Sequence, residues 1–270
     1  MGQPVAGNPT QYIMEKCFAK AGLDWRYLTL EVAPDALSGA VAGMHAMGFR
    51  GGNVTSTHKQ AVVPLLDELS RAARMIGRVN CINRQGDQLI GENTDGKGLL
   101  ASLAGVTDPA GKRVVILGAG SVARAVAVEL ALAGAADITI VNRTESPGKE
   151  LSELLGTDAG IASHFTPLDG DYVVPEGTDL LVNGTSIGLF NAEAHVPVEV
   201  SSLGKGLIVA DVVFSPSVTS LLREAKERGC TTLDGLTMLV NQARICFKLW
   251  TNVEADADVM RESLEEFLGL

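Results

Sequence analysis

A glycine-rich turn places the strongest constraint on the fold of this chain. Residues 118–123 have the pattern G-x-G-x-x-A and directly follow the apolar run Arg113–Leu117. Such a run is typical of a strand buried on both faces of a parallel sheet. Residues 121–133 then have the composition of a helix. A strand, a tight turn and a helix in this order predict a unit that binds a dinucleotide.

The small residues of the turn each have a physical role in this prediction. Gly118 permits the tight turn, Gly120 lets the backbone approach a pyrophosphate, and Ala123 lets helix and strand pack closely. The start of the helix offers unpaired N–H groups to the phosphates. The alternative is a glycine-rich turn that binds nothing. The predicted cofactor-binding residues of the turn are Gly118, Ala119, Gly120, Ser121 and Val122.

Strand-like and helix-like segments alternate downstream of the turn. Strands are predicted at 137–141, 179–183, 207–211 and 231–233, and a helix at 218–228. This alternation predicts an α/β fold with a Rossmann-like, doubly wound parallel sheet. Two helices, at 236–248 and 255–268, close the chain and are expected to pack back on the N-terminal domain.

The first hundred residues form a separate α/β pattern. Helices are predicted at 12–21, 34–47 and 65–76, strands at 26–32 and 51–54, and a hairpin at 79–90. The chain is therefore expected to form two domains. Residues 1–97 with 236–270 form the substrate-binding and catalytic domain, and residues 98–235 form the dinucleotide-binding domain.

Composition and charge exclude several functional classes. The 270 residues carry a net charge of −10, whereas nucleic-acid binding requires a basic surface. The four cysteines and four histidines are scattered without metal-ligand spacing, so no metal site is predicted. No apolar run reaches the length of a membrane span, and no secretory signal is visible. The expected compartment is the cytoplasm, and the expected partner is a small molecule.

Two polar segments supply candidate proton-transfer groups. Lys59 ends the run Asn53-Val-Thr-Ser-Thr-His-Lys59, and Asp95 ends Glu92-Asn-Thr-Asp95. Hydride removal from a carbinol carbon requires the hydroxyl proton to leave in step. A partly desolvated lysine beside a carboxylate can accept that proton. The alternative for Lys59 and Asp95 is a structural ion pair.

The end of the second strand of the dinucleotide unit predicts the cofactor. An acidic residue there binds the ribose 2′-hydroxyl of NAD, whereas an arginine suits the 2′-phosphate of NADP. Arg143 favours NADP, because a guanidinium can fork onto a phosphate. Glu145 favours NAD, so NAD stays possible. The predicted cofactor-binding residues of this segment are Asn142, Arg143 and Thr144.

These motifs together resemble the shikimate dehydrogenase family over nearly the whole chain. The matching segments are Gly48-Phe-Arg-Gly-Gly-Asn-Val-Thr55 with Lys59, Ile76-Gly-Arg-Val-Asn80, Gly91-Glu-Asn-Thr-Asp95, the turn at Gly118, Asn142-Arg-Thr144, Asn183-Gly-Thr-Ser-Ile-Gly188, Asp211-Val-Val-Phe-Ser-Pro216 and Gly235-Leu-Thr-Met-Leu239 with Gln242. The resemblance implies reversible oxidation of a ring alcohol, with shikimate as substrate and 3-dehydroshikimate as product.

The resemblance also implies roles for individual residues. Lys59 and Asp95 match the catalytic pair. Thr55, Asn80 and Gln242 match residues that hydrogen-bond the ring hydroxyls, and amides suit this role because they offer both donors and an acceptor. Thr185 and Met238 fall where the family contacts the nicotinamide.

Three departures from the family pattern bear on the substrate. A Ser-x-Ser segment that holds the substrate carboxylate in the family is replaced here by Asn8 and Thr10. The proline two residues before the catalytic lysine is replaced by Thr57. A strand that normally precedes Gly2 is absent, which predicts either a start further upstream or an N-terminal sheet without that strand.

Three functions remain open from the sequence. The first is an NADP-preferring shikimate dehydrogenase of aromatic amino-acid biosynthesis. The second is a quinate dehydrogenase or a paralogue that acts on another cyclic hydroxy acid, and the changes at Asn8 and Thr10 favour it. The third is a non-catalytic regulator that binds a cofactor or metabolite. The expected oligomeric state is a monomer or homodimer.

Overall fold

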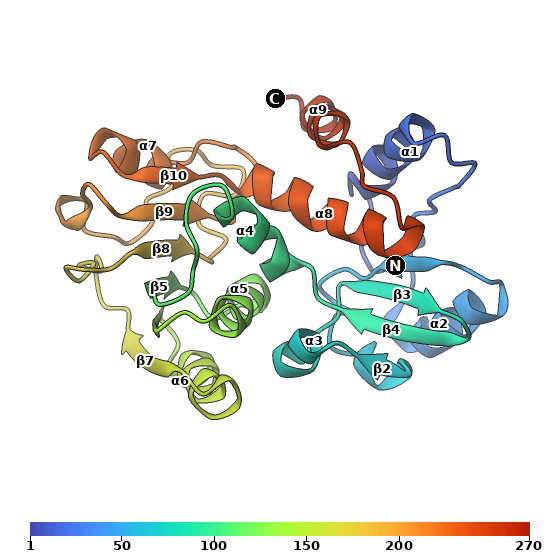
Figure 1. Cartoon of the computed structure of the whole chain (residues 1–270), viewed down its shortest axis with the longest axis horizontal. Coiled ribbons are helices and arrows are strands. Elements are labelled where there is room, and N and C mark those ends of the chain that lie inside the picture. The colour runs from blue at the N-terminus through green and yellow to red at the C-terminus, as the bar shows by residue number, and fades with distance from the viewer. The chain divides into compact units, whose positions relative to one another are not determined.

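The computed structural model describes all 270 residues and divides into two compact units (Figure 1). Unit 1 comprises residues 1–94 and 240–270, and unit 2 comprises residues 95–239. Helix α8 (Gly235–Thr251) begins in unit 2 and ends in unit 1.

Unit 2 is built on a six-stranded parallel sheet with the order β10-β9-β8-β5-β6-β7. The strands span Arg113–Leu117 (β5), Asp137–Asn142 (β6), Ala162–Pro167 (β7), Leu180–Asn183 (β8), Ile208–Asp211 (β9) and Thr231–Leu233 (β10). Aliphatic side chains on β5, β8 and β9 are buried, as their uninterrupted apolar sequences predict. This topology confirms the predicted doubly wound sheet.

The strand order reverses between β5 and β8, so the carboxyl ends of these two strands border the switch point of the sheet. Leu117 of β5 lies opposite Val141 of β6 on one side and Asn183 of β8 on the other. Ligands of open α/β sheets bind outside the carboxyl ends of strands at such a point. Gly118 and Gly184 are the first residues beyond those two ends.

The helices of unit 2 are α4 (Asp95–Leu103), α5 (Ser121–Leu132), α6 (Glu145–Leu154) and α7 (Ser220–Glu227). Helix α4 packs on α5. A Cβ at Gly96 would lie 2.3 Å from the carbonyl oxygen of Ala125, so only glycine permits this approach. The sequence analysis did not predict α4, α6 or β7.

Unit 1 contains a four-stranded sheet with the order β1-β3-β4-β2. The strands span Gly51–Asn53 (β1), Glu68–Leu69 (β2), Cys81–Gln85 (β3) and Gln88–Glu92 (β4). The predicted hairpin is present, and Gln85 pairs with Gln88 across its turn. Its helices are α1 (Thr10–Lys20), α2 (Leu37–Ala46), α3 (Arg71–Ile76), the second part of α8, and α9 (Ala257–Leu268). Helix α9 packs on α1, as expected for the C-terminal helices.

Two predicted elements of unit 1 are wrong. Residues 26–32 form no strand, although the segment is extended. The backbone N–H groups of Tyr27 and Thr29 donate instead to the side chains of Glu15 and Gln11 on α1. The predicted helix at 65–76 is shortened to α3, because Ser70 accepts a hydrogen bond from the Ala73 N–H and caps the helix there.

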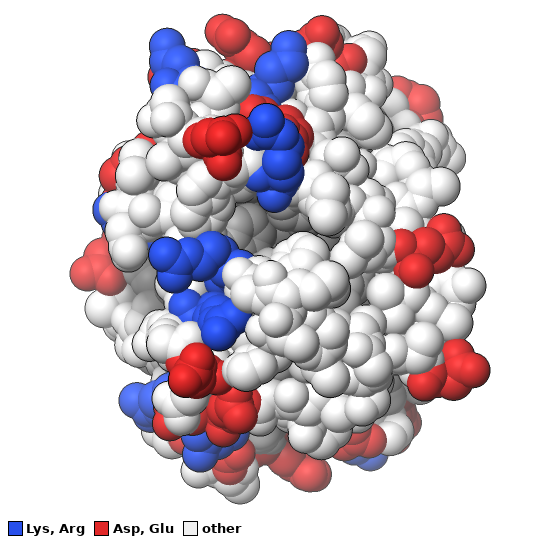
Figure 2. All heavy atoms as spheres, turned by 90° about the vertical axis from the view of Figure 1, so that its right-hand side faces the viewer, with Lys and Arg blue, Asp and Glu red and all other residues white.

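The surface charges and side-chain clusters give no sign of a nucleic-acid surface or of a metal site. Acidic and basic side chains are interspersed on the face shown in Figure 2, and a group of basic side chains lies beside a hollow. That face has no continuous basic surface. No group of three or more potential metal ligands occurs, the four cysteines are free and buried, and no helix is long and apolar enough to cross a membrane.

Candidate active site

The predicted substrate residues Asn8 and Thr10 lie at the start of helix α1 in unit 1. The side-chain oxygen of Asn8 accepts a hydrogen bond of 2.9 Å from the Thr10 N–H. This bond satisfies one of the N–H groups that a helix start leaves unpaired. Asn8 is exposed, and its amide nitrogen remains a donor toward solvent. The position therefore offers N–H and O–H groups without a positive charge.

The segment that carries Lys59 is a series of turns fixed by main-chain hydrogen bonds. The Thr55 N–H donates to the Met1 carbonyl, and the Lys59 carbonyl accepts from the Val79 N–H at 2.8 Å. His58 is completely buried, and its Nε2 lies 2.7 Å from the Val32 carbonyl oxygen. The sequence analysis missed His58, which anchors the residue next to Lys59. Lys59 itself is half-buried.

Asn80 and Gln242, which share a predicted role, meet in one hydrogen-bonded network. Asn80 Nδ2 donates to Thr94 Oγ1 at 3.0 Å, and the Thr94 N–H donates to Asn80 Oδ1 at 2.8 Å. The Thr94 hydroxyl also lies 3.2 Å from Gln242 Oε1. Asn80 and Thr94 are buried, whereas Gln242 is half-buried. Residues from a strand start, a loop and helix α8 thus converge on one polar cluster.

A second layer of side chains supports this cluster. Asn53 Nδ2 donates to the Asn80 carbonyl at 3.2 Å and lies 3.4 Å from Cys246 Sγ. The Tyr27 hydroxyl donates to Asn53 Oδ1 at 2.9 Å. Burial raises the pKa of Tyr27 far above its usual value, so the hydroxyl stays protonated and remains a donor. Sequence reasoning missed Thr94 and Cys246, although Cys246 lies four residues after Gln242 and therefore on the same helix face.

Asp95 is the first residue of helix α4 and belongs to unit 2, whereas Lys59 belongs to unit 1. A carboxylate in the first turn of a helix is stabilised by the partial positive charge of the helix start. Both residues make interactions in the structure. The pairing of Lys59 with Asp95 stays a prediction of the sequence.

The glycine turn of unit 2 has the form that a pyrophosphate requires. Gly118 has φ +98°, a left-handed conformation that favours glycine, and its N–H donates to the Val141 carbonyl. A Cβ at Gly120 would meet no atom within 4 Å, so open space lies beside the start of α5. No side chain caps that start, which leaves the first N–H groups of α5 to a ligand.

The segment after β6 supports the predicted preference for NADP. Arg143 is exposed, and the Asn142 amide fixes the turn by donating to the Thr144 carbonyl at 2.7 Å. Glu145 forms an ion pair of 2.7 Å with Lys149. Lys149 lowers the pKa of Glu145, and Glu145 raises the pKa of Lys149. Because Lys149 compensates the charge of Glu145, the carboxylate does not oppose an anion at Arg143.

Thr185 is fixed by a buried network at the ends of β8 and β9. Asn183 Oδ1 accepts hydrogen bonds from the Thr185 N–H and hydroxyl, at 3.1 and 2.7 Å. Asn183 Nδ2 donates in turn to Asp211 Oδ1 at 3.0 Å. Asp211 is 1% exposed and also accepts from the Val213 N–H and the Thr219 hydroxyl. Burial raises the pKa of Asp211, although these hydrogen bonds act in the opposite direction.

Met238 lies in the first turns of α8 and is buried. Asp234 caps this helix by accepting from the Thr237 N–H at 2.7 Å. Gly235 is required beside it, because a Cβ there would lie 2.3 Å from the Val213 carbonyl oxygen. The α8 start is thus packed against the loop that follows β9. Met238 and Thr185 are thus both connected to the end of β9, Met238 through Gly235 and Thr185 through Asn183 and Asp211.

The variant Asp211→Ala is expected to lower the free energy of unfolding by about 2–4 kcal/mol, because three buried donors lose their acceptor. The matched variant Asp211→Asn should cost less than about 1 kcal/mol. Its amide oxygen still accepts from Asn183 and Val213, while its nitrogen can donate to the Thr219 hydroxyl. Urea unfolding of the three proteins measures the difference. If Asp211→Ala lowers the free energy of unfolding no more than Asp211→Asn does, the hydrogen bonds that Asp211 accepts do not stabilise this loop.

Three family models match the chain. They are described as the shikimate dehydrogenase substrate binding domain (residues 1–82), shikimate/quinate 5-dehydrogenase (residues 101–181) and the shikimate 5′-dehydrogenase C-terminal domain (residues 235–265). A curated shikimate dehydrogenase (NADP⁺) from Methanopyrus kandleri is 41% identical over 273 residues, which cover 99% of this chain and 94% of that protein.

Solved structures show the same similarity. A ligand-free 5-ketofructose reductase from Gluconobacter sp. strain CHM43 is 49% identical, with a TM-score of 0.96 over 98% of this chain and 96% of that one. A shikimate 5-dehydrogenase from Thermus thermophilus, in complex with NADP(H) and shikimate, is 32% identical, with a TM-score of 0.84 over 99% and 97%. The chain therefore belongs to the shikimate dehydrogenase family.

Proposed function

We propose that this protein is an NADP(H)-dependent oxidoreductase that interconverts a secondary alcohol and a ketone on a polyhydroxylated substrate. The observation that carries the proposal is the match of about 40% identity to curated shikimate dehydrogenases along nearly the whole chain. The match extends over both units of the chain. Shikimate and 3-dehydroshikimate are the substrate pair that the curated relatives support.

The residues of unit 2 fit NADP. The open space at Gly120 and the uncapped start of α5 suit the pyrophosphate, and Arg143 suits a 2′-phosphate. Thr185 and Met238 are proposed to contact the nicotinamide. The bound cofactor supplies the acceptor or donor of the hydride.

The residues of unit 1 are proposed to bind the substrate and move its proton. Thr55, Asn80 and Gln242 hydrogen-bond the substrate hydroxyls, and Asn8 and Thr10 bind its far end. Lys59 takes the proton from the reacting hydroxyl as the ketone forms and returns it in the reverse direction. Asp95 orients Lys59 and stabilises its charged form. The hydrogen bonds already made within the Asn80 cluster hold these donors in place before substrate arrives.

A second candidate reaction is the reduction of 5-ketofructose. Two observations favour it: the identity of 49% to the Gluconobacter 5-ketofructose reductase, and the replacement of the family's paired serines by Asn8 and Thr10. 5-Ketofructose has no carboxylate, and the uncharged donors at Asn8 and Thr10 can hydrogen-bond a neutral hydroxyl. Turnover rates on shikimate, quinate and 5-ketofructose, each with NADP(H) and NAD(H), decide between the reactions.

Lys59→Ala is expected to lower kcat at least about 100-fold, because the reacting hydroxyl loses its proton acceptor. Affinity for NADP⁺, measured by calorimetry, should change less than about twofold, since the charge lost is not one of the cofactor contacts. The control is Lys20→Ala, which removes an exposed lysine from the end of α1. A variant at position 59 that retains turnover would exclude the proposed proton transfer.

Arg143→Gln is expected to raise the KM for NADP⁺ about tenfold or more, because one charged contact to the 2′-phosphate is lost. The KM for NAD⁺ should stay within about twofold. Lys226→Gln is the matched control, because it removes one exposed positive charge from unit 2, in the last turn of α7. Equal effects of the two variants on NADP⁺ would contradict a specific role for Arg143.

The double variant Asn8→Ser, Thr10→Ser tests where substrate choice is made. If the family's paired hydroxyls select a carboxylate, this variant should raise kcat/KM for shikimate relative to 5-ketofructose by about tenfold. The single variant Thr10→Ser separates the two positions. An unchanged ratio would show that the start of α1 does not set specificity.

A further inference from the structure

One hydroxyl group lies at the centre of the polar cluster of unit 1. Thr94 is completely buried, and its Oγ1 lies 3.0 Å from Asn80 Nδ2, 3.2 Å from Gln242 Oε1 and 3.3 Å from Cys246 Sγ. A hydroxyl has one proton to donate and two lone pairs that accept. The direction of these hydrogen bonds therefore decides which end of each amide faces the cluster and which end is left for a ligand.

The orientation of the Asn80 amide is fixed by the main chain. The Thr94 N–H can only donate, and it lies 2.8 Å from Asn80 Oδ1, so that end of the amide must be the oxygen. The other end is then the nitrogen, Nδ2, which donates to Thr94 Oγ1 at 3.0 Å. Nδ2 also lies 3.5 Å from Gln242 Oε1. Asn80 thus presents a donor to both Thr94 and Gln242.

Because Thr94 Oγ1 accepts from Asn80, its own proton is available to a neighbouring acceptor. Gln242 Oε1 lies at 3.2 Å, and Asn80 Oδ1 and Cys246 Sγ both lie at 3.3 Å. Asn80 Oδ1 already accepts the Thr94 N–H at the shorter distance of 2.8 Å, and sulfur is a weak acceptor. The Thr94 hydroxyl therefore donates to the amide oxygen of Gln242.

These hydrogen bonds direct the oxygen of the Gln242 amide toward the cluster. In the reverse orientation, the amide nitrogens of Asn80 and Gln242, which are both donors, would face each other at 3.5 Å. Gln242 is half-buried, so the accessible end of its amide is the nitrogen with its two N–H groups. A substrate atom that contacts this nitrogen must accept a hydrogen bond, as a hydroxyl or carbonyl oxygen does.

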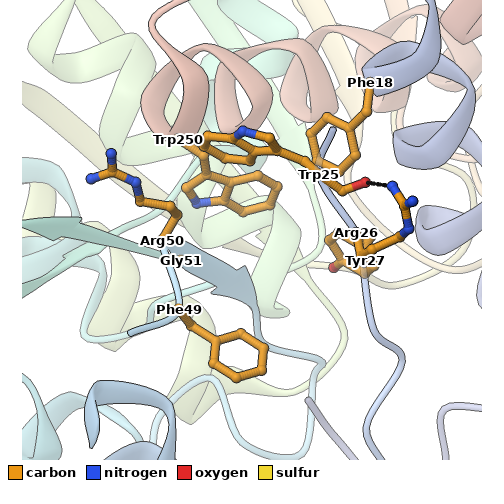
Figure 3. Close-up of a pocket in the computed structure, with 8 residues that line it drawn as sticks. All are labelled: Phe18, Trp25, Arg26, Tyr27, Phe49, Arg50, Gly51 and Trp250. Atoms are coloured by element: carbon orange, nitrogen blue, oxygen red, sulfur yellow. Dashed lines mark hydrogen bonds between the residues drawn. The ribbon is translucent and has the colours of Figure 1, made fainter. Parts of the chain in front are cut away.

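Aromatic side chains hold the part of α8 that follows Gln242. The Trp250 indole donates to the Ile82 carbonyl on β3 at 2.9 Å, and the rings of Trp250 and Tyr27 lie 6.1 Å apart. Figure 3 shows Tyr27 and Trp250 among the side chains that line one cavity of unit 1. These contacts do not involve Thr94. Loss of the Thr94 hydroxyl is therefore expected to affect the orientation of the Gln242 amide and not the position of the helix.

We propose that Thr94 is a positioning residue for substrate binding. Together with Asn80, it holds the Gln242 amide with its oxygen toward the cluster and its nitrogen toward the substrate. This role rests on the proposed function, because it takes Gln242 as a substrate contact. It adds the direction of that contact: Gln242 donates, and the substrate carries an acceptor oxygen at this place. An amide that is already oriented need not turn when substrate binds.

The first test removes the hydroxyl. Thr94→Val has nearly the same shape, and it should raise the KM for the best substrate among shikimate, quinate and 5-ketofructose about tenfold, because the Gln242 amide loses its fixed orientation. The kcat and the KM for NADP(H) should stay within about threefold. Thr94→Ser keeps the hydroxyl and should bring the substrate KM back to within about threefold of the unmodified protein. A substrate KM that rises equally in both variants, or a loss confined to kcat, would overturn the proposal.

A double-mutant cycle shows whether Thr94 acts through Gln242. Gln242→Met removes the amide but keeps a side chain of similar length. When Thr94→Val is added to Gln242→Met, the substrate KM should change less than about twofold further, because the amide that Thr94 orients is already gone. If Thr94→Val raises the KM by the same factor with and without Gln242→Met, Thr94 acts independently of Gln242 and the proposal is overturned.

Neutron diffraction from crystals of the protein grown in D₂O tests the same assignment without any turnover. The deuterium of the Thr94 hydroxyl should point at Gln242 Oε1, and the deuterons of the Gln242 amide should lie at the end away from Thr94. A hydroxyl deuterium that points at Cys246, with the Gln242 nitrogen facing Thr94, would overturn the proposal. If none of the three substrates is turned over, the proposed function fails, whereas this measurement still decides the orientation of the amide.

Discussion

The pairing of β5 with β8 is the constraint on which unit 2 depends, because the strand order reverses there. A glycine follows each of these strands. Because glycine has no Cβ, the start of α5 and the loop that carries Thr185 can pack closely against these two positions. A Cβ at Gly184 would lie 2.7 Å from the Ala123 Cβ, and one at Gly118 would lie 3.1 Å from Thr185 Cγ2. Any larger side chain at either position would separate the start of α5 from the loop that carries Thr185. The glycine turn, the start of α5 and the loop that carries Thr185 are therefore packed directly against one another.

In the polar cluster of unit 1, the main constraint is that buried polar groups need hydrogen-bond partners. Asn80 and Thr94 are buried, and a buried amide or hydroxyl without a partner is costly. Asn80 and Thr94 hydrogen-bond each other. Asn53 donates to the Asn80 carbonyl, and Cys246 forms a hydrogen bond with the Thr94 hydroxyl. Gln242 is only half-buried, so it is the member of the cluster that can exchange a bond for one to a substrate hydroxyl. The cluster thus keeps its geometry by its own hydrogen bonds, and the proposed binding of substrate there would require little rearrangement.

The parts that could be predicted from the sequence are those specified by local chemistry. Strand β5 was predicted with its observed ends, because an aliphatic run between a lysine and a glycine has few alternatives. The segment 26–32 alternates as a strand should, but Glu15 and Gln11 lie outside it and take its N–H groups. Thr94 and Cys246 were missed for the same reason, since the bonds of Thr94 to Gln242 and Cys246 join residues 148 and 152 positions apart in the sequence. Local patterns do not contain such contacts.

The family similarity constrains the redox chemistry of this protein more tightly than it constrains the substrate. The glycine turn and the Asn183–Asp211 network are held by packing and buried hydrogen bonds at the ends of the strands, so substitutions there are expected to cost stability. Asn8 lies instead on the surface just before α1, and its side-chain oxygen already accepts a hydrogen bond from the Thr10 N–H. A change there alters the donors that a ligand meets without disturbing any buried group. Substrate selection is therefore expected to depend on few residues at this helix start, and relatives with the same cofactor site can differ in the compound they reduce.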